Sequence, residues 1–323
     1  MIISLGDDCK NLKTMLRKSV SKNYAEGLLL SGGLDSSILA TMLQPKYSFT
    51  VAMGRDAPDL PFAKLVAKKY SENHLEIITN PKKILLFIEQ VIQIFKTFDP
   101  IEIRNSSVSL IGMRSAKDHG CHRVMTGDGG DELFAGYNYL SRYYQDIKKL
   151  DSELQRLWRI MHFSSKQIGR LLGVDVRTPF VYKEFANYAK SIDPIKKIGM
   201  YSGHWWGKLI LRQCFESELG KEIVWRPKLA QEQGAGIIQI KNTIINNLDN
   251  MTFHLDRKKA LSEGVRIRGK EHLYYYNIFR RYFSTPKEED CPSDSAHCPE
   301  CNGCLNWINR FCRICGAFPV KPK

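Results

Sequence analysis

The chain has 323 residues, 43% of them hydrophobic, and its 48 lysines and arginines against 34 acidic residues give a formal net charge of +14. This length and composition predict a globular protein with one large core, or one core and a small appendage. A run of about 20 apolar residues and a signal-peptide pattern are both absent, which predicts a cytoplasmic protein and no membrane contact. The positive charge suits a polyanion such as RNA, and equally an ATP site.

The elements begin with a polar lead-in, residues 1–24, that contains a helix around 11–19. From residue 25 to about 80, apolar strands alternate with helices, which predicts an α/β fold with a parallel sheet and helices on both faces. The expected strands are 25–30, 49–53 and 74–79, and the expected helices are one from residue 34 and one over 60–69.

Two further helices are expected at 84–95 and 108–117, before a last strand at 123–125. Beyond residue 137 the pattern passes into an α-rich C-terminal part, with helices expected at 143–160 and 206–219. A charged segment at 285–290 interrupts the pattern and predicts a linker. The predicted organisation is therefore a lead-in, a large α/β domain and a small cysteine-rich tail, over residues 1–24, 25–285 and 286–323.

The turn at residues 31–37, SGGLDSS, joins the first strand to the first helix of the α/β part. Two glycines let the backbone approach a ligand, and the unpaired N–H groups of a helix N-terminus suit an anion. The lysine of an ordinary phosphate loop is missing, and an acid, Asp35, stands inside the turn. An acid beside phosphates implies a bridging Mg²⁺.

A second glycine-rich turn, TGDGGDELFAGY at residues 126–137, follows the strand at 123–125. It places three acids, Asp128, Asp131 and Glu132, within five positions. Acids so close repel one another unless cations neutralise them, and the Mg²⁺ of a bound Mg²⁺–pyrophosphate would be such a cation. A solvated acidic loop is the alternative for this turn taken alone.

The two motifs together resemble the synthetase domain of glutamine-dependent asparagine synthetases and β-lactam synthetases, in the PP-loop ATP pyrophosphatase superfamily. Further elements resemble the same family in the same order, between about residues 25 and 240: 56–60, 103–106, 173–180, 208–212 and 226–228. The resemblance implies a PP-loop, adenine nucleotide α hydrolase-like fold. It also implies an ATP- and Mg²⁺-dependent, AMP-forming amide ligase that adenylates an acid such as aspartate.

The resemblance also implies roles for individual residues. Asp128 would orient the attacking nucleophile or take its proton, Lys228 would neutralise the phosphates, and Arg104 would bind the acidic substrate. The residues implied to bind nucleotide are Ser31, Gly32, Gly33, Asp35, Ser36, Val51, Met53, Gly127 and Asp131, with Asp35 and Asp131 as the Mg²⁺ ligands. The alternatives are a surface lysine at 228 and a salt-bridge arginine at 104.

Two departures from the family bear on the substrates. A glutaminase domain does not fit into the 24 residues before the first strand, so nitrogen is expected from free ammonia, a separate amidotransferase subunit or another amine. Asp175 replaces the usual glutamate, and Val181 and Tyr182 stand where the family has Leu-Asp. These changes leave the acceptor acid open.

The tail holds six of the nine cysteines. Cys298, Cys301, Cys312 and Cys315 form two CxxC pairs whose spacing predicts a four-thiolate Zn²⁺ site that supplies folding energy. Cys291, His297 and Cys304 are candidates for a second metal centre, and an iron–sulfur site that uses Cys304 is the alternative. Disulfides are not expected without an export signal.

Two other functions stay open. The first is a tRNA-modifying PP-loop enzyme, suggested by basic segments at 257–259 and 266–270 and by the aromatics of 274–276 and Trp307. Solvated lysines and core tyrosines would explain the same residues. The second is a catalytically silent binding subunit, which the presence of Asp35, Asp128, Asp131 and Lys228 disfavours.

Overall fold

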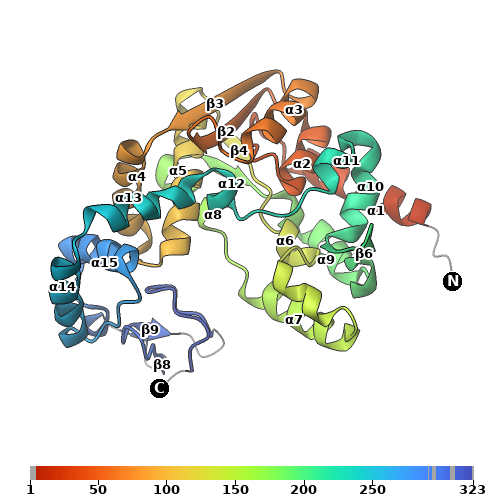
Figure 1. Cartoon of the computed structure of the whole chain (residues 1–323). Helices are drawn as coiled ribbons and strands as arrows, with labels where there is room; N and C mark the ends of the chain where they lie inside the picture. Colours follow the sequence, from red (N-terminus) through yellow and green to blue (C-terminus); the bar gives the residue numbers. More distant parts are fainter. Residues whose placement is uncertain (1–4, 290, 293–295, 306–309, 322–323) are drawn as a thin grey trace. The chain divides into compact units, whose positions relative to one another are not determined.

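The computed structural model describes residues 5–289, 291–292, 296–305 and 310–321, and Trp307 lies outside these ranges. The chain divides into two compact units (Figure 1). Unit 1 consists of residues 1–77 and 112–230, and unit 2 of residues 78–111 and 231–323. The boundaries drawn on composition after residues 24 and 285 remain predictions.

A five-stranded sheet in the order β3-β2-β1-β4-β5 forms the centre of unit 1. β1 pairs in parallel with β2 and β4, and β4 pairs in parallel with β5. The strands are β1 (Gly27–Leu29), β2 (Tyr47–Met53), β3 (Asn73–Thr79), β4 (Arg123–Met125) and β5 (Asp175–Arg177). The parallel α/β fold is confirmed, and of the five strands in this sheet the sequence missed β5, a short strand with one buried position.

The strand order reverses between β1 and β4, because the chain moves outward through β2 and β3 before it returns to the other side of β1. Ligands of open parallel sheets bind at the carboxyl ends of the strands at such a reversal. Residues 31–37 follow β1, and residues 126–137 follow β4. The two motifs therefore lie side by side at the position where this fold class binds ligands.

Alternate side chains of the first strand segment point to opposite faces of the sheet. Leu28 and Leu30 belong to a buried cluster that includes Leu12 and Ile38 from the helices on one face. On the other face, Leu29 Cδ2 lies 3.1 Å from the Cβ position of Gly112. The sheet is thus covered by helices on both faces, as predicted.

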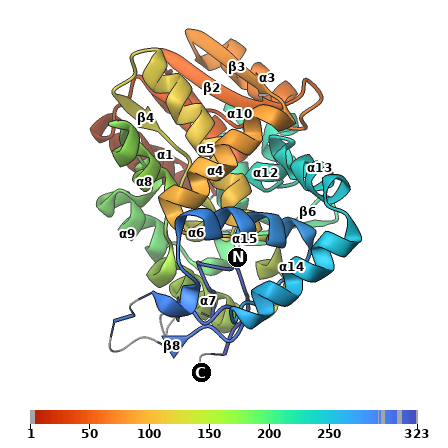
Figure 2. The same cartoon turned by 90° about the vertical axis from the view of Figure 1, so that its left-hand side faces the viewer.

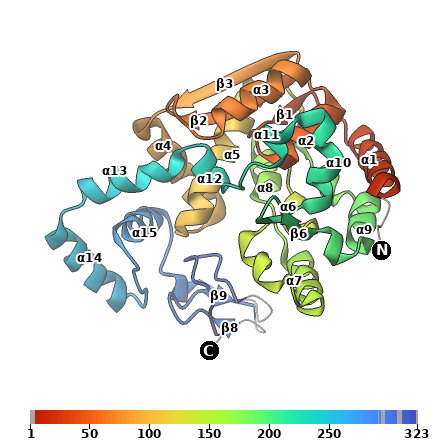
Figure 3. The same cartoon turned by 45° about the vertical axis from the view of Figure 1, so that its right-hand side comes forward.

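The helices on the first face pack against one another as well as on the sheet (Figure 3). They are α1 (Leu5–Lys22), α2 (Leu34–Leu43), α3 (Leu60–Tyr70), α9 (Lys183–Ser191), α10 (Leu209–Leu219) and α11 (Lys221–Val224), and α5 (Pro100–Asp118) carries Gly112 on the other face. Unit 1 also contains the α-helices α6 (Gly130–Leu133), α7 (Ile147–Ile160) and α8 (Ser164–Leu172).

The helix predicted over 206–219 is wrong at its start. β6 (Ile198–Tyr201) and β7 (His204–Gly207) form an antiparallel hairpin, and α10 begins only at Leu209. Ser202 and Gly203 make the turn with φ of 48° and 77°, the left-handed conformation of tight hairpin turns. The apolar pattern of 206–219 is compatible with both structures, so it did not reveal the hairpin.

Lys197 lies in the interior of unit 1 with none of its surface exposed. Within the described ranges its Nζ has no hydrogen-bond partner, and it lies 5.0 Å from the centre of the Trp158 ring. Burial lowers the pKa of Lys197 to about 8, although Asp151 and Asp193 partly oppose the shift. The charged form of this lysine therefore destabilises the fold.

We expect Lys197→Met to raise the free energy of unfolding at pH 7 by about 3 kcal/mol, since a buried unpaired charge is removed. The unfolded lysine binds its proton more tightly than the folded one, so the wild type gains stability as the pH rises through about 8 toward about 10.5. The variant lacks this gain. Urea unfolding at several pH values measures both curves, and parallel curves would contradict the assignment.

Unit 2 is mainly helical around an aromatic core (Figure 2). Phe98 packs against Tyr276 and Phe279 at ring-centre distances of 5.0 and 5.2 Å. Besides the first part of α5, its elements are α4 (Pro81–Phe95), α12 (Gln231–Gly234), α13 (Ile240–Asn247), α14 (Asn250–Ser262), α15 (Lys270–Tyr282), β8 (Ala296–His297) and β9 (Cys304–Leu305). Tyr275 and Tyr276 are buried, which favours core tyrosines over base stacking.

Two disulfides are present, and they correct the expectation that the cysteines of this chain form none. Cys9 of α1 is joined to Cys214 of α10, 205 residues away, because those two helices pack together. Cys291 is joined to Cys304, which therefore is not free for a second metal centre or an iron–sulfur site. Among the described residues, no helix is both long and apolar enough to cross a membrane.

Candidate active site

The turn after β1 brings its two serines against the glycine backbone. The N–H of Gly33 donates to Ser31 Oγ at 3.2 Å, and Ser36 Oγ donates to the carbonyl of Gly33 at 3.2 Å. Gly32 has a φ of 76°, and a Cβ there would lie 2.5 Å from the backbone nitrogen of Ala63. Only glycine fits this position, and the turn thus presents hydroxyls and the N-terminus of α2 at one point.

Two aspartates and two lysines meet beside this turn. Lys208 Nζ donates to Asp35 and lies 2.8 Å from Asp131 Oδ1, so one buried ammonium group bridges both acids. Lys228 Nζ donates to the other oxygen of Asp131, Oδ2, at 2.8 Å. The side chain of Lys208 is 5% exposed and that of Lys228 26%, so solvent reaches the cluster from the Lys228 side.

The surrounding charges shift the pKa values of the two aspartates in opposite directions. Burial raises the pKa of Asp35, and the ammonium of Lys208 offsets only part of that effect. Burial acts on Asp131 as well, but Lys208 and Lys228 outweigh it and hold the pKa of Asp131 at about 2. Within the described part of the chain, Asp35 Oδ1 is buried without a hydrogen-bond partner. An unpaired buried carboxylate oxygen suits a cation ligand.

The glycines of the second motif allow these acids to approach its backbone. A Cβ at Gly130 would lie 2.4 Å from Asp35 Cγ, and one at Gly136 would lie 2.0 Å from Asp131 Oδ1. At Gly127 the added carbon would be 3.0 Å from Asp35 Cβ. The glycines therefore make room for Asp35, Asp131, Lys208 and Lys228, which are called the acid–lysine cluster below.

Asp128 is on the same loop, but its side chain has different partners. Its Oδ2 accepts hydrogen bonds from Thr126 Oγ1 at 2.8 Å and from the hydroxyl of Ser165 at the start of α8. Burial raises the pKa of Asp128, and these two hydrogen bonds and Lys166 lower it by less. The sequence did not indicate Ser165 as a partner.

Glu132 and Tyr137 extend the cluster through Lys228. The Tyr137 hydroxyl donates to Glu132 Oε1 at 2.5 Å, and Lys228 Nζ lies 4.6 Å from the centre of the Tyr137 ring. Trp158 Nε1 donates to the Glu132 carbonyl at 2.9 Å. The aromatic face thus adds a contact that favours the lysine charge near Asp131.

Arg226 holds the segment that carries Lys228. Its guanidinium donates to the carboxylate of Asp59 at the start of α3 and lies 4.0 Å from the centre of the Phe62 ring. Its Nη1 also reaches the carbonyl of Gly32 at 3.5 Å. Residues 56–60 and 226–228, which resemble family elements, therefore join the turn after β1 to Lys228.

The remaining nucleotide-binding candidates lie at the end of β2. Val51 and Met53 are the fifth and last residues of this buried strand, which pairs with β1. Their backbone therefore lies at the same edge of the sheet as the turn after β1. Ser31, Gly32, Gly33, Asp35, Ser36, Gly127, Asp131 and Lys228 are all brought together around that turn.

Arg104 belongs to unit 2 and has a separate set of contacts. It donates through Nε to Glu232 and through Nη1 to Glu271, and all three side chains are at most 9% exposed. Burial lowers the pKa of Arg104, but the hydrogen bonds and charges of the two glutamates outweigh it and raise the pKa. These are the contacts of a salt-bridge arginine, the alternative that the sequence left open.

Lys208 is the main residue that the sequence did not assign. It stands just before α10 with a φ of 58°, and its segment, 208–212, matches a family element without indicating a role. Its N–H donates to the carbonyl of Phe134 at 2.8 Å, so this turn is fixed against the second motif. The family element was the only signal in the sequence.

A family model described as asparagine synthase matches residues 11–172 and 164–290. The glutamine-hydrolyzing asparagine synthetase of Homo sapiens is 29% identical over 300 residues, covering 84% of this chain and 52% of the human protein. The enzyme of Cricetulus griseus is 30% identical over 291 residues, covering 83% of this chain and 51% of the relative.

Asparagine synthetase B of Escherichia coli (strain K12) is 29% identical over 314 residues, covering 88% of this chain and 55% of that protein. The chain thus spans about half the length of the curated relatives it matches. The family model includes both glycine-rich turns and every member of the acid–lysine cluster. On the extent of this match, the chain belongs to the asparagine synthase family.

Proposed function

We propose that this protein is an ATP-dependent, AMP-forming amide ligase of the asparagine synthetase type. The observation that carries the proposal is the convergence of Asp35, Asp131, Lys208 and Lys228 beside the glycine-rich turn after β1. Two acids for a metal and two lysines for phosphate charge, next to a helix N-terminus, suit a nucleoside triphosphate.

The turn after β1 binds the pyrophosphate part of ATP in this proposal. Ser31 and Ser36 contribute hydroxyls, and Gly32 and Gly33 permit close approach of the backbone. The backbone of Val51 to Met53, at the same sheet edge, holds the adenine. Lys208 and Lys228 neutralise the charge that develops on the phosphates, a contribution that such groups typically make at the level of several kcal/mol.

Mg²⁺ fits the two aspartates, because among the described residues Asp35 Oδ1 is buried without a hydrogen-bond partner, and because Asp131 is held as a carboxylate. Asp35 and Asp131 would hold the ion, which when bound neutralises phosphate oxygens. Each acid also contacts Lys208, so the lysine is placed to keep both carboxylates charged and oriented.

The proposed reaction has two steps. A carboxylate oxygen of the acid bonds to the α-phosphorus of ATP as the α–β anhydride bond breaks and pyrophosphate leaves. An amine nitrogen then bonds to the acyl carbon as AMP leaves. Asp128 takes the proton that the nitrogen loses, because a carboxyl with a raised pKa accepts a proton more readily near neutral pH.

The acid is a small carboxylic acid such as aspartate, and the nitrogen comes from ammonia, free or supplied by a separate amidotransferase subunit. The glutamine-hydrolyzing relatives motivate this choice of donor. A tRNA-modifying function is disfavoured, because the relatives carry asparagine synthetase names and two of the three tyrosines at 274–276 are buried. A silent subunit would have no need of the complete acid–lysine cluster.

ATP–pyrophosphate exchange in the presence of single candidate acids tests the proposal. We expect exchange with one small acid, amide formation when ammonium is added, and at least a roughly 100-fold loss of exchange in Asp35→Asn and Asp131→Asn. Asp118→Asn, an exposed position at the end of α5, is the matched control and should keep full activity. If exchange survived both substitutions, the assignment of Asp35 and Asp131 to the site would be wrong. If no acid supported exchange, the proposal of a ligase would be wrong.

A further inference from the structure

Two segments of the tail, residues 298–302 and 312–316, share one backbone geometry. In each, the N–H of the fifth residue donates to the carbonyl of the first at 2.8 Å. The fifth residues, Asn302 and Gly316, have φ of 58° and 73°. Each segment is therefore one tight turn that contains a CxxC pair, and it is called a knuckle below. The turn brings the two sulfurs of the pair to the same side.

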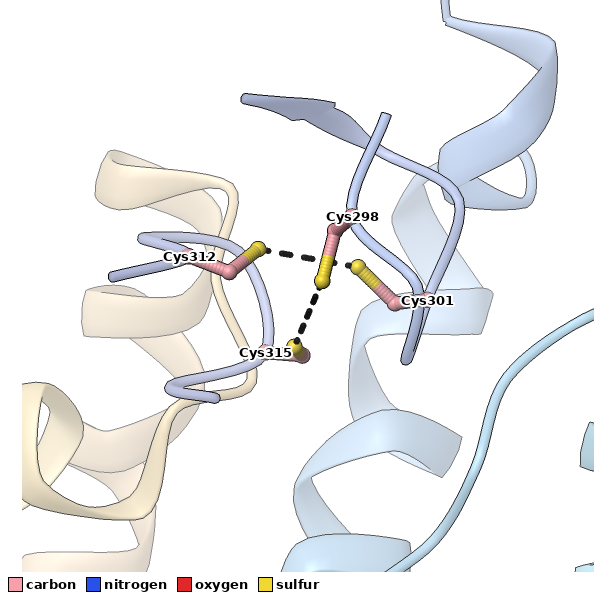
Figure 4. Close-up of side chains that lie close together, drawn as sticks. All are labelled: Cys298, Cys301, Cys312 and Cys315. Carbon is pink, nitrogen blue, oxygen red and sulfur yellow. Dashed lines mark hydrogen bonds between the residues drawn. The ribbon is translucent and has the colours of Figure 1, made fainter. Parts of the chain in front are cut away.

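The sulfurs of the two knuckles face one another (Figure 4). They form the four-cysteine cluster, Cys298, Cys301, Cys312 and Cys315. Its sulfur atoms all lie within 4.8 Å of one another, two of the separations are 3.7 and 3.8 Å, and each cysteine is at most 1% exposed. A tetrahedron with Zn–S bonds of about 2.3 Å has edges of about 3.8 Å.

This spacing favours one metal ion over the alternatives. Bonded sulfurs lie about 2.05 Å apart, and all four cysteines are free, so the four-cysteine cluster is not a pair of disulfides. Iron–sulfur clusters hold their cysteines further apart, because iron and sulfide atoms stand between the sulfurs. The N–H of Glu300 also donates to Cys298 Sγ at 3.4 Å, a contact that stabilises a thiolate.

We propose that the four-cysteine cluster binds one Zn²⁺ as four thiolates and that this ion fastens together two helix starts of unit 2. Four protein ligands leave no open position, so the ion is structural and takes no substrate. The two helix starts are residues 97–99, which lead into α5, and residues 264–268, which lead into α15. This inference does not depend on the ligase proposal.

The second knuckle is attached to the start of α5. The N–H of Phe98 donates to the carbonyl of Ile314 at 2.8 Å, and Thr97 Oγ1 donates to the carbonyl of Arg313 at 2.7 Å. A Cβ at Gly316 would lie 2.3 Å from Asp99 Oδ1, so glycine lets the knuckle approach this segment. The loop before α5 thus packs directly on the metal-binding turn.

The first knuckle is attached to the segment before α15. The N–H of Arg266 donates to the carbonyl of Glu300 at 2.7 Å, and Asn302 Nδ2 donates to the carbonyl of Gly264 at 2.8 Å. Arg268 reaches across to the second knuckle and donates to the carbonyl of Cys315. The segment before α15 thus contacts both knuckles, and the segment before α5 contacts the second, so an ion shared by the knuckles strengthens the link between α5 and α15.

The same two helices carry a buried ion pair. Arg104 of α5 donates to Glu271 of α15, and both lie within a few residues of the fastened segments. The ion pair and the metal thus link the same helices at two neighbouring places. Loss of the metal should therefore loosen the first turns of both helices rather than the whole of unit 2.

Metal content of the full-length wild type is the first test. We expect one zinc per chain after purification without chelator, and zinc release in step with modification of four thiols by a mercurial reagent. Cobalt exchange should give the absorption of tetrahedral thiolate coordination. Iron in place of zinc, or no metal with four freely reactive thiols, would overturn the assignment.

Hydrogen exchange of the wild type, with and without its metal, tests the fastening. We expect amides of residues 97–103 and 264–273 to exchange at least about 10-fold faster once zinc is removed, whereas β1 and β2 keep their protection. Cys301→Ser and Cys312→Ser should reproduce this pattern. Cys121→Ser, a buried free cysteine of unit 1, is the matched control. Unchanged protection after zinc removal would refute the fastening role.

Discussion

Replacing Lys208 by methionine is expected to lower ATP–pyrophosphate exchange by at least about 1000-fold and to destabilise the fold by about 3–5 kcal/mol. The lysine is 5% exposed and bridges Asp35 and Asp131, so its loss leaves two buried carboxylates facing each other. Lys228 still contacts Asp131, but Asp35 loses the cation that it hydrogen-bonds. The loss of activity comes in addition, because phosphate charge is no longer neutralised at this point.

The pH dependence of the Lys208→Met variant gives a sharper criterion. Without the lysine, burial and mutual repulsion raise the pKa of Asp35 further above its unfolded value, so the folded variant binds protons more tightly than the unfolded chain. Its stability should therefore rise as the pH falls from 8 toward 5. Lys64→Met, which removes an exposed pair with Glu76, should change stability by less than about 0.5 kcal/mol. A Lys208→Met variant as stable as this control would contradict the bridge.

Arg104→Met is expected to destabilise the protein by about 3–5 kcal/mol, because Glu232 and Glu271 would stay buried without a counter-charge. Thermal and urea unfolding measure the loss. Adding Glu232→Gln and Glu271→Gln to the variant should recover part of it, since neutral amides need less compensation. Arg281→Met, whose partner Glu89 lies 3.9 Å away on the surface, is the control with little expected effect.

The same variant separates the two roles considered for Arg104. A salt-bridge arginine changes stability and leaves the KM for the acid near its wild-type value when the assay is run well below the unfolding temperature. An arginine that binds the acid instead raises KM without a comparable loss of stability. A raised KM with unchanged unfolding would return Arg104 to the substrate site.

The sequence by itself determined the features that depend on neighbouring residues. Apolar runs separated by turn residues located four of the five strands, and glycine with acid at 31–37 and 126–137 marked the two turns at the reversal of strand order. The CxxC spacing likewise predicted that four sulfurs would meet. Each of these patterns is local, because strand periodicity, turn chemistry and ligand spacing act over a few residues.

Tertiary structure alone decided which distant side chains meet. Lys208 reaches Asp35 across 173 positions, Arg104 reaches Glu271 across 167, and Cys9 is bonded to Cys214 across 205. A charged or sulfur side chain gives no local sign of its partner, since the pairing follows from how the helices pack on the sheet. The two glycine-rich turns could therefore be predicted from the sequence, whereas the tertiary structure was needed to show that Lys208 bridges their aspartates.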